Sequence, residues 1–290
     1  MVAQATERGL SQRRACRLAD VARSSARYQA HPRDDQALRE QLEQIKHKYP
    51  RFGIPRAHAL LRAEGQDINR KHVERIWRKH GLQVPQRPKK RKIRTGRLVP
   101  CQAEHPDHVW SYDFQEDGLL SGRKLRILSV LDEFTREWLS VSVGVSLTSQ
   151  AVLMALKPLF ASRAVPRFVR SDNGPEFIAA EVRGWLTESG SAPHYIDPGC
   201  PWQNGFQESF HGKLRDELLD REVFASVAEA QVRLESQRRW YNEERPHSSL
   251  KYLPPAAFAR AWRQGNQEQH KQAESDALLD NQNTHFARGT

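Results

Sequence analysis

The stretch His108-Val109-Trp110-Ser111-Tyr112-Asp113-Phe114 decides which fold the second half of the chain adopts. Aromatic side chains at positions 110, 112 and 114 alternate with smaller residues, and a period of two is typical of a strand. Two more strands are expected at residues 124–131 and 137–143, joined by residues 132–136. A connection this short favours antiparallel neighbours.

Beyond these strands, helical and strand-like segments alternate. The pattern predicts helices at residues 148–160, 175–188, 202–219 and 227–241, and short strands at residues 167–171 and 194–197. Three strands followed by alternating helices and strands indicate an α/β domain, in which helices cover a mixed sheet. Asp132 is expected to shape the turn between the second and third strands.

The first part of the chain has a different, helical pattern. Residues 54–63 are expected to form a helix with Pro55 in its first turn, and a second helix should run from the Asn69 cap to Gly81. Val73, Ile76 and Trp77 form its apolar stripe. The cationic residues predicted to face outward are Arg70, Lys71, Arg75, Arg78 and Lys79.

Two helices and a short connection predict a helix-turn-helix, whose basic second helix can enter the major groove of DNA. A basic helical bundle that contacts only phosphates remains the alternative. Residues 10–28 give a weaker copy of the pattern, with Leu10, Ala15, Leu18 and Val21 as its expected core.

Charge is distributed unevenly along the 290 residues, whose formal net charge is +11. Residues 1–104 hold 25 Lys and Arg against 10 Asp and Glu, whereas residues 105–290 hold 21 against 25. The basic part is therefore expected to bind a polyanion. Neither a membrane-spanning run nor a signal-peptide segment is visible, which predicts a cytoplasmic protein.

These patterns predict four regions. Residues 1–83 form a helical DNA-binding region, residues 84–104 a basic linker, residues 105–262 the α/β core with its C-terminal helices, and residues 263–290 a polar, disordered tail. The three cysteines are too far apart for a disulfide framework. Cys101, His105 and His108 lie close in sequence, but no fourth zinc ligand accompanies them.

Three carboxylates are the candidates for chemistry. Asp113 lies near the end of the first predicted strand, Asp172 directly follows the strand at 167–171, and Glu208 lies on the predicted helix 202–219. Strand ends face ligands in open sheets. Three carboxylates in one site repel each other unless a cation intervenes, and Mg²⁺ prefers such oxygen ligands together with phosphate oxygens. Each acid taken singly is more simply a turn cap or a surface group, so the hypothesis depends on all three together.

The helix that carries Glu208 presents two different sides. Phe206, Phe210 and Leu214 recur every four residues and are expected to face the core. Asn204, Glu208, His211 and Arg215 line up on another side, which places Arg215 two turns from Glu208, where it can meet a phosphate.

At these residues the sequence resembles the DDE transposase and integrase superfamily, whose core has an RNase H-like fold. Asp172 and Glu208 are separated by 35 residues, the spacing of the family signature. More closely, the chain resembles the OrfB products of one large family of bacterial insertion sequences. The matching segments are residues 108–114, 171–177, 204–215 and the Tyr-Asn-x-x-Arg-Pro-His segment at 241–250.

The resemblance implies that Asp113, Asp172 and Glu208 are the catalytic, metal-binding triad and that Arg215 is the basic residue seven positions after the glutamate. It also implies two Mg²⁺ ions, with Mn²⁺ as a substitute, and the ends of an insertion sequence and target DNA as substrates. The resemblance further implies a homo-oligomer on DNA and association with the bacterial nucleoid. An OrfA partner or an OrfA–OrfB fusion is also expected, because the family's leucine-zipper region is missing here. The zinc module of retroviral integrases is also missing, so zinc is not implied.

The sequence therefore predicts a transposase subunit that cleaves DNA and transfers strands. A non-catalytic DNA-binding protein, such as a repressor or an inhibitor of transposition, has the same basic helices and needs no metal. A nuclease of the ribonuclease H type remains a second alternative, because the fold alone does not decide function.

Overall fold

The computed structural model describes the chain except for residues 29–34, 85–100, 198–199 and 267–290. It divides into two compact units, Met1–Gln41 and Leu42–Thr290, and the boundary falls inside helix α4 (Gln36–Lys48). Most of the expected basic linker and of the expected polar tail lies outside the described residues. Among the described helices, none has the length and apolar character needed to cross a membrane.

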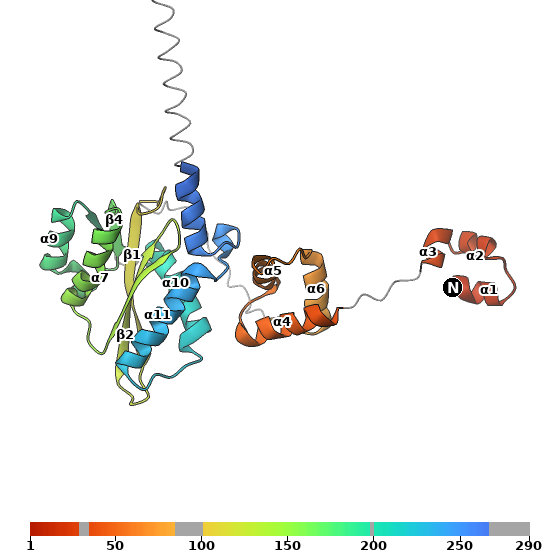
Figure 1. Ribbon diagram of the computed structural model, residues 1–290, viewed down its shortest axis with the longest axis horizontal. Coiled ribbons are helices and arrows are strands. Elements are labelled where there is room, and N and C mark those ends of the chain that lie inside the picture. The colour runs from red at the N-terminus through yellow and green to blue at the C-terminus, as the bar shows by residue number, and fades with distance from the viewer. Residues whose placement is uncertain (29–34, 85–100, 198–199, 267–290) are drawn as a thin grey trace, which may run out of the picture. The chain divides into compact units, whose positions relative to one another are not determined.

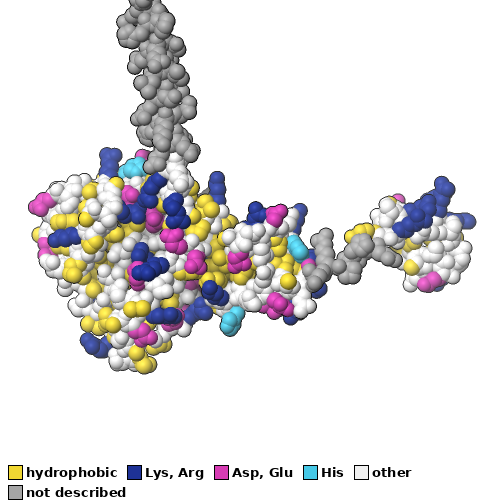
Figure 2. All heavy atoms as spheres, viewed as in Figure 1, with side chains coloured by type: hydrophobic (Ala, Val, Ile, Leu, Met, Phe, Trp, Pro, Cys, Tyr) yellow, Lys and Arg dark blue, Asp and Glu magenta, His cyan; other side chains and the backbone are white. Residues whose placement is uncertain are grey.

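The first unit contains the short helices α1 (Val2–Glu7), α2 (Gln12–Leu18) and α3 (Arg23–Arg27). The expected core of this region is partly wrong: Ala15 is buried, as expected, but Leu18 is 73% exposed and Val21 is 39% exposed. Helix α3 is only five residues long, too short to cover these side chains, and Cys16 is buried beside Ala15 instead. Figure 2 shows Lys and Arg side chains gathered on one side of this unit.

The predicted helix-turn-helix is present as α5 (Ile54–Ala63) and α6 (Arg70–Lys79). Pro55 lies in the first turn of α5, and the Asn69 side chain accepts a 2.8 Å hydrogen bond from the Lys71 backbone N–H at the start of α6. Gly65 and Gly81 follow the two helices with positive φ angles, which glycine adopts without strain. The buried side chains beneath them are Leu42, Phe52, Ala57, Leu61, Val73, Ile76 and Trp77.

The second half of the chain contains a five-stranded sheet with the order β3-β2-β1-β4-β5. Its strands are β1 (Val109–Gly118), β2 (Lys124–Asp132), β3 (Trp138–Gly144), β4 (Phe168–Ser171) and β5 (Ala192–Tyr195). The first three pair antiparallel, whereas β4 pairs parallel with both β1 and β5. The fold is therefore the predicted mixed sheet of an RNase H-like core.

Helices cover both faces of the sheet (Figure 1). Helices α7 (Ser149–Ser162), α8 (Pro175–Ile178) and α9 (Ala180–Glu188) lie over one face, where Trp110 and Tyr112 are buried. Helices α10 (Gly205–Leu214) and α11 (Val227–Glu243) lie over the other, where Ile127 and Trp138 are buried. A final helical stretch covers residues 255–266. The predicted alternation of residues along β1 is confirmed, because its aromatic side chains share one core.

Several predicted boundaries are wrong. The helix expected at 175–188 is two helices, because Ala179 adopts an extended conformation with ψ 135° between them. The helix expected at 202–219 has three parts, a 3₁₀ turn at Pro201–Asn204, α10, and a π-helical turn at Arg215–Leu219. Strand β5 begins two residues earlier than expected, where Ala192 pairs with Phe168 of β4.

Candidate active site

Asp113 lies in the middle of β1, not near its end as the sequence suggested, because β1 continues to Gly118 to pair with β2. It is nevertheless level with the end of β4. Ser111 pairs with Arg170 in the parallel register, so two residues further along each strand Asp113 comes opposite Asp172. The longer strand therefore brings the first carboxylate to the place where its parallel neighbour ends.

The local structure around Asp172 orients its carboxylate. Asp172 Oδ1 accepts a 2.9 Å hydrogen bond from the Gly174 backbone N–H, which closes a tight turn directly after β4. A Cβ atom at position 174 would lie 3.1 Å from this oxygen and 3.2 Å from the Phe177 ring. This close approach explains why position 174, two residues after the aspartate, is a glycine.

Glu208 is held near β1 through its neighbour on α10. Gln207 is fully buried, and its Nε2 donates a 2.7 Å hydrogen bond to the Ser111 carbonyl oxygen. Gln115, also on β1, donates to the carbonyl oxygen of His211 at 3.3 Å. Two contacts from β1 therefore hold α10, and they leave the Glu208 side chain exposed.

The charges of the three acids act on one another. Burial, the Asp172 carboxylate and, to a smaller extent, the Glu208 carboxylate together raise the pKa of Asp113 to about 7. Burial is the largest of these causes. The Phe114 backbone N–H opposes the rise by donating a 2.8 Å hydrogen bond to Asp113 Oδ1. The structure thus brings the predicted acids within electrostatic reach of one another. Among the described residues, however, no three His, Cys, Asp or Glu side chains are close enough together to enclose a metal ion.

Two polar side chains of α10 and the turn before it also approach Asp113. Asn204 Nδ2 lies 3.4 Å from Asp113 Oδ2, and His211 Nδ1 lies 3.8 Å from the same oxygen. Burial and the Arg215 charge lower the pKa of His211 to about 4, so the imidazole is neutral at physiological pH. Buried Asn204 Oδ1 has no hydrogen-bond partner among the described residues, and it is an unsatisfied acceptor beside the acids.

Arg215 does not extend freely from the helix. Its guanidinium donates a 2.7 Å hydrogen bond to the Glu116 carbonyl oxygen of β1, and it lies 3.6 Å from Asp220. The side chain is still 42% exposed, so a ligand can reach it. Its position joins the far end of α10 to the strand that carries Asp113.

Sequence reasoning missed Arg170, which is fully buried on β4 two residues before Asp172. It donates to Glu133 Oε2 at 3.1 Å, to the Gln203 carbonyl oxygen at 3.2 Å and to the Cys101 carbonyl oxygen at 2.7 Å. A charged residue inside the apolar run Phe168-Val169-Arg170 was the available signal. The side chain connects the strand before Asp172 to the turn that leads into α10.

Other residues discussed from the sequence have simpler surroundings. Asp132 accepts hydrogen bonds from the backbone N–H groups of Phe134, Thr135 and Asp107, which confirms its role in the turn.

The three residues that lie close in sequence, Cys101, His105 and His108, have different neighbours. The His105 ring stacks on the His108 ring with 4.6 Å between their centroids, whereas Cys101 Sγ lies 3.9 Å from Nδ1 of His194. Phe206 was expected in the core but is only half-buried, because it lines a cavity beneath Arg136.

The predicted DNA-contacting face of α6 is exposed to solvent. All five cations on it are exposed: Arg70, Lys71, Arg75, Arg78 and Lys79. One of them, Arg78, forms an ion pair of 2.5 Å with Glu74 one turn earlier. The buried stripe of Val73, Ile76 and Trp77 holds this face outward.

Comparison with known proteins agrees with this architecture. Two family models described as integrase core domain match residues 103–201 and 189–255, and one described as HTH-like domain matches residues 32–90. The integrase matches contain all five strands, α10 and α11. The three candidate acids all lie within them.

Three relatives match most of the chain. It is 38% identical over 251 residues to an uncharacterized 31.7 kDa protein of insertion element IS407 from Burkholderia multivorans, covering 86% of this chain and 91% of that protein. It is also 38% identical over 255 residues to an uncharacterized 39.2 kDa protein of insertion element IS476 from Xanthomonas euvesicatoria, covering 88% and 74%. The third, from Escherichia coli K12, is InsK, named as a candidate transposase of IS150; it is 26% identical over 259 residues, covering 83% and 91%. With an integrase core behind a helix-turn-helix region, the chain belongs to the family of insertion-sequence DNA transposases.

Proposed function

We propose that Asp113, Asp172 and Glu208 act together as a DDE site, with which the chain cleaves the ends of its insertion sequence and joins them to target DNA. The observation that supports this most directly is the parallel register of β1 and β4, which brings Asp113 opposite Asp172, and the Glu208 charge also acts on Asp113. Membership of the transposase family supplies the class of reaction, transfer of a polynucleotide strand.

The donors around this space suit a hard divalent cation. Three carboxylates offer oxygen ligands of the kind that Mg²⁺ and Mn²⁺ prefer, and the unsatisfied Asn204 Oδ1 adds a neutral oxygen nearby. Without a cation the acids repel each other, and this repulsion adds to the rise that burial causes in the pKa of Asp113. Two bound ions would activate the attacking oxygen and stabilise the leaving oxygen of a phosphodiester.

The protein's own residues position the reacting groups. Gln207 and Arg170 fix the backbone on either side of the acids, so that Glu208 and Asp172 can approach a phosphate from two different elements. The Arg215 side chain is partly exposed, and it is placed to neutralise another phosphate of the same DNA strand. The neutral His211 adds no competing positive charge beside Asp113.

We further propose that residues 1–83 bind the DNA of the element end, with α6 in the major groove. Residues 84–104 then link this region to a catalytic core at residues 105–262, and residues 263–290 form a tail. The exposed cations of α6 support the first part. The proposal includes a homo-oligomer on DNA. It also includes a partner or fusion derived from OrfA, which would supply the leucine-zipper region of the family.

The test uses purified full chain and labelled DNA from the end of its insertion sequence. Asp113→Asn, Asp172→Asn and Glu208→Gln should each abolish nicking and joining in Mg²⁺ while DNA binding stays within about twofold of the wild type. Glu188→Gln, an exposed acid at the end of α9, is the matched control. DNA binding without metal-dependent cleavage by the wild type would leave a repressor or inhibitor, and cleavage confined to an RNA–DNA hybrid would indicate a nuclease of the ribonuclease H type.

A further inference from the structure

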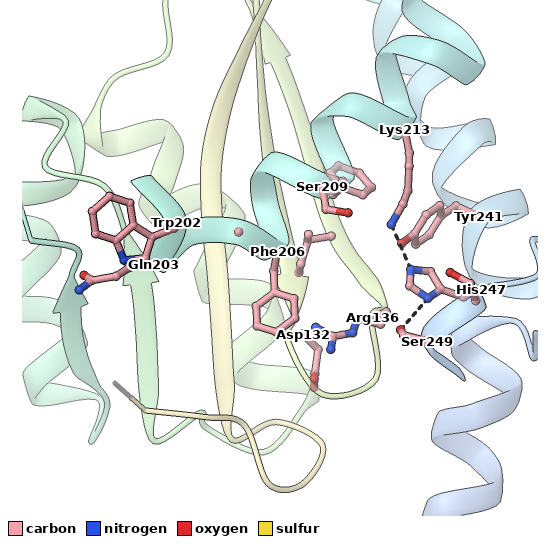
Figure 3. A pocket seen from close by; sticks show the side chains of 14 residues that line it. Asp132, Arg136, Trp202, Gln203, Phe206, Ser209, Lys213, Tyr241, His247 and Ser249 are labelled. Atoms are coloured by element: carbon pink, nitrogen blue, oxygen red, sulfur yellow. Dashed lines mark hydrogen bonds between the residues drawn. The ribbon is translucent and has the colours of Figure 1, made fainter. Parts of the chain in front are cut away.

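The cavity that Phe206 lines lies beside α10, on the neighbouring side of the helix from Glu208. Its volume is about 380 Å³, and Figure 3 shows the side chains that surround it. We call it the Lys213 pocket, after one of its lining residues; the others that matter here are Arg136, Phe206, Ser209, Tyr241 and His247. Glu208 and Ser209 are consecutive and both exposed, so a strand lying across α10 can reach both sites.

The Lys213 amine is held in place by a short chain of hydrogen bonds (Figure 3). Lys213 Nζ lies 3.5 Å from His247 Nε2, and Ser249 Oγ lies 2.9 Å from His247 Nδ1. Burial and, to a smaller extent, the Lys213 charge together lower the pKa of His247 to about 3, so the ring is neutral. A neutral ring that accepts from Lys213 at Nε2 carries its proton on Nδ1 and donates it to Ser249.

Positive charge accumulates around this amine. Burial is the largest cause that lowers the pKa of Lys213, to about 8. The charges of Arg245 beyond α11, Arg56 of α5 and Arg136 of the turn after β2 add to this lowering, whereas Glu217 opposes it. Glu217 is already committed to Arg245, which donates to it twice at 2.6 and 2.5 Å. Within the described part of the chain, neither Lys213 nor Arg136 forms a direct ion pair with an acid, although the Glu133 and Asp132 charges act on Arg136 from a distance.

Arg136 provides the opposite side of the pocket. Its guanidinium lies over the Phe206 ring, 3.8 Å from the ring centroid, and its backbone has a positive φ of 64°. The aromatic contact fixes the plane of the guanidinium. Buried Nη1 of Arg136 donates to no acceptor among the described residues. Asp132 also lines the pocket, but its oxygens accept from three backbone N–H groups.

An ammonium, a guanidinium and a hydroxyl, here those of the lining residues Lys213, Arg136 and Ser209, are groups that recognise phosphate oxygens. We propose that the Lys213 pocket binds a backbone phosphate of the DNA strand whose neighbouring phosphodiester enters the carboxylate site. The inference rests on the proposed function for its substrate, DNA. It also gives a role to the Tyr-Asn-x-x-Arg-Pro-His segment, because Tyr241 and His247 line the pocket and Arg245 lies behind it.

A phosphate-binding role and a structural role for Lys213 predict opposite effects on stability. If the amine binds phosphate and is repelled by the neighbouring cations when no DNA is bound, Lys213→Met should raise the midpoint of thermal unfolding without DNA. If the amine is a structural support for His247, the same change should lower the midpoint. Lys157→Met, at an exposed position on α7, removes the same charge elsewhere and should leave the midpoint unchanged.

Binding is measured with the full chain, a mixed-sequence single strand of about 12 nucleotides and a chelator, over a range of salt concentrations. Loss of one phosphate contact should weaken binding several-fold and reduce the slope of log affinity against log salt by about 0.7 for Lys213→Met. The proposal is overturned if Lys213→Met behaves like Lys157→Met, or if it lowers the unfolding midpoint.

These measurements also separate this inference from the proposed enzyme activity. No divalent ion is present, so cleavage contributes nothing to the signal. Asp113→Asn should retain the full salt slope of the wild type. If Lys213→Met shows the reduced slope while the wild type never cleaves DNA in Mg²⁺, the phosphate site stands and the DDE activity fails. If the wild type cleaves DNA and Lys213→Met keeps the wild-type salt slope, the DDE activity stands and the phosphate site fails.

Discussion

Gln207 donates a 2.7 Å hydrogen bond to the carbonyl oxygen of Ser111, which joins the helix of Glu208 to the strand of Asp113. Each of the two residues is close in sequence to an acid, since Gln207 precedes Glu208 and Ser111 lies two positions before Asp113. The same amide lies 3.3 Å from Ser111 Oγ and 3.4 Å from the Ser129 carbonyl oxygen of β2. One buried side chain thus connects three elements beneath the carboxylates.

Replacing Gln207 with Leu should weaken both the fold and the site. The Ser111 carbonyl would lose a buried donor, at a cost of about 1–3 kcal/mol in the free energy of unfolding. Since α10 could then shift against β1, DNA cleavage should fall by more than DNA binding. Denaturant unfolding and the cleavage assay, run beside Gln44→Leu at an exposed position of α4, measure the two effects. Unchanged cleavage by a folded variant would refute the positioning role.

Arg170 and Glu133 should behave as a buried ion pair. Burial raises the pKa of Glu133 to about 7, and the nearby Arg170 charge opposes the rise. Arg170→Met would leave that carboxylate buried without its partner, which typically lowers the free energy of unfolding by about 3–5 kcal/mol. The double variant Arg170→Met with Glu133→Gln should regain part of the loss. Equal stability of the single and double variants would show that the two residues are not coupled.

The raised pKa of Asp113 predicts how stability changes with pH in the absence of metal. The ordinary value is 3.8 and the folded value is about 7. Folding therefore favours the protonated acid, so its contribution to stability is complete below about pH 4 and is lost as pH rises through 7. Relative to wild type, Asp113→Asn should gain up to about 4 kcal/mol between pH 4 and 8 in chelator. A constant difference between the two proteins across this range would contradict the raised pKa.

Neutralising the exposed face of α6 should weaken DNA binding in a salt-dependent way. Lys71→Gln and Lys79→Gln each remove one exposed cation without disturbing the buried stripe of the helix. For a duplex, each lost phosphate contact should reduce the slope of log affinity against log salt by about 0.9. Lys157→Gln on α7 is the control. If both changes leave the slope at the wild-type value, this face of α6 does not contact the DNA backbone.

The elements that sequence predicted best are those whose ends are set by local chemistry. Pro55, Gly65, Asn69 and Gly81 mark the ends of α5 and α6, and these bounds agree with the structure. The break at Ala179 had no such signal, because alanine favours helix. Likewise, the middle position of Asp113 depends on how far β1 pairs with β2, which the sequence of β1 does not contain.

The site was predictable in part for the same reason. The spacing of the acids and their places beside predicted strands named Asp113, Asp172 and Glu208 as the candidate site, and in the structure the charges of Asp172 and Glu208 both act on Asp113. The Lys213 pocket could not be predicted, because Arg136, Lys213 and His247 meet only after the β2–β3 turn and the segment after α11 fold against α10. Its one signal was the Tyr241–His247 segment, whose side chains had no assigned role.

The most direct test of the account is the binding of Mn²⁺ to the full chain with DNA from its element end, measured by the paramagnetic signal of the free ion. The wild type and Glu188→Gln should bind two ions per chain, whereas Asp113→Asn, Asp172→Asn and Glu208→Gln should each lose at least tenfold in affinity. If any of the three variants binds Mn²⁺ as the wild type does, the acids do not form one metal site.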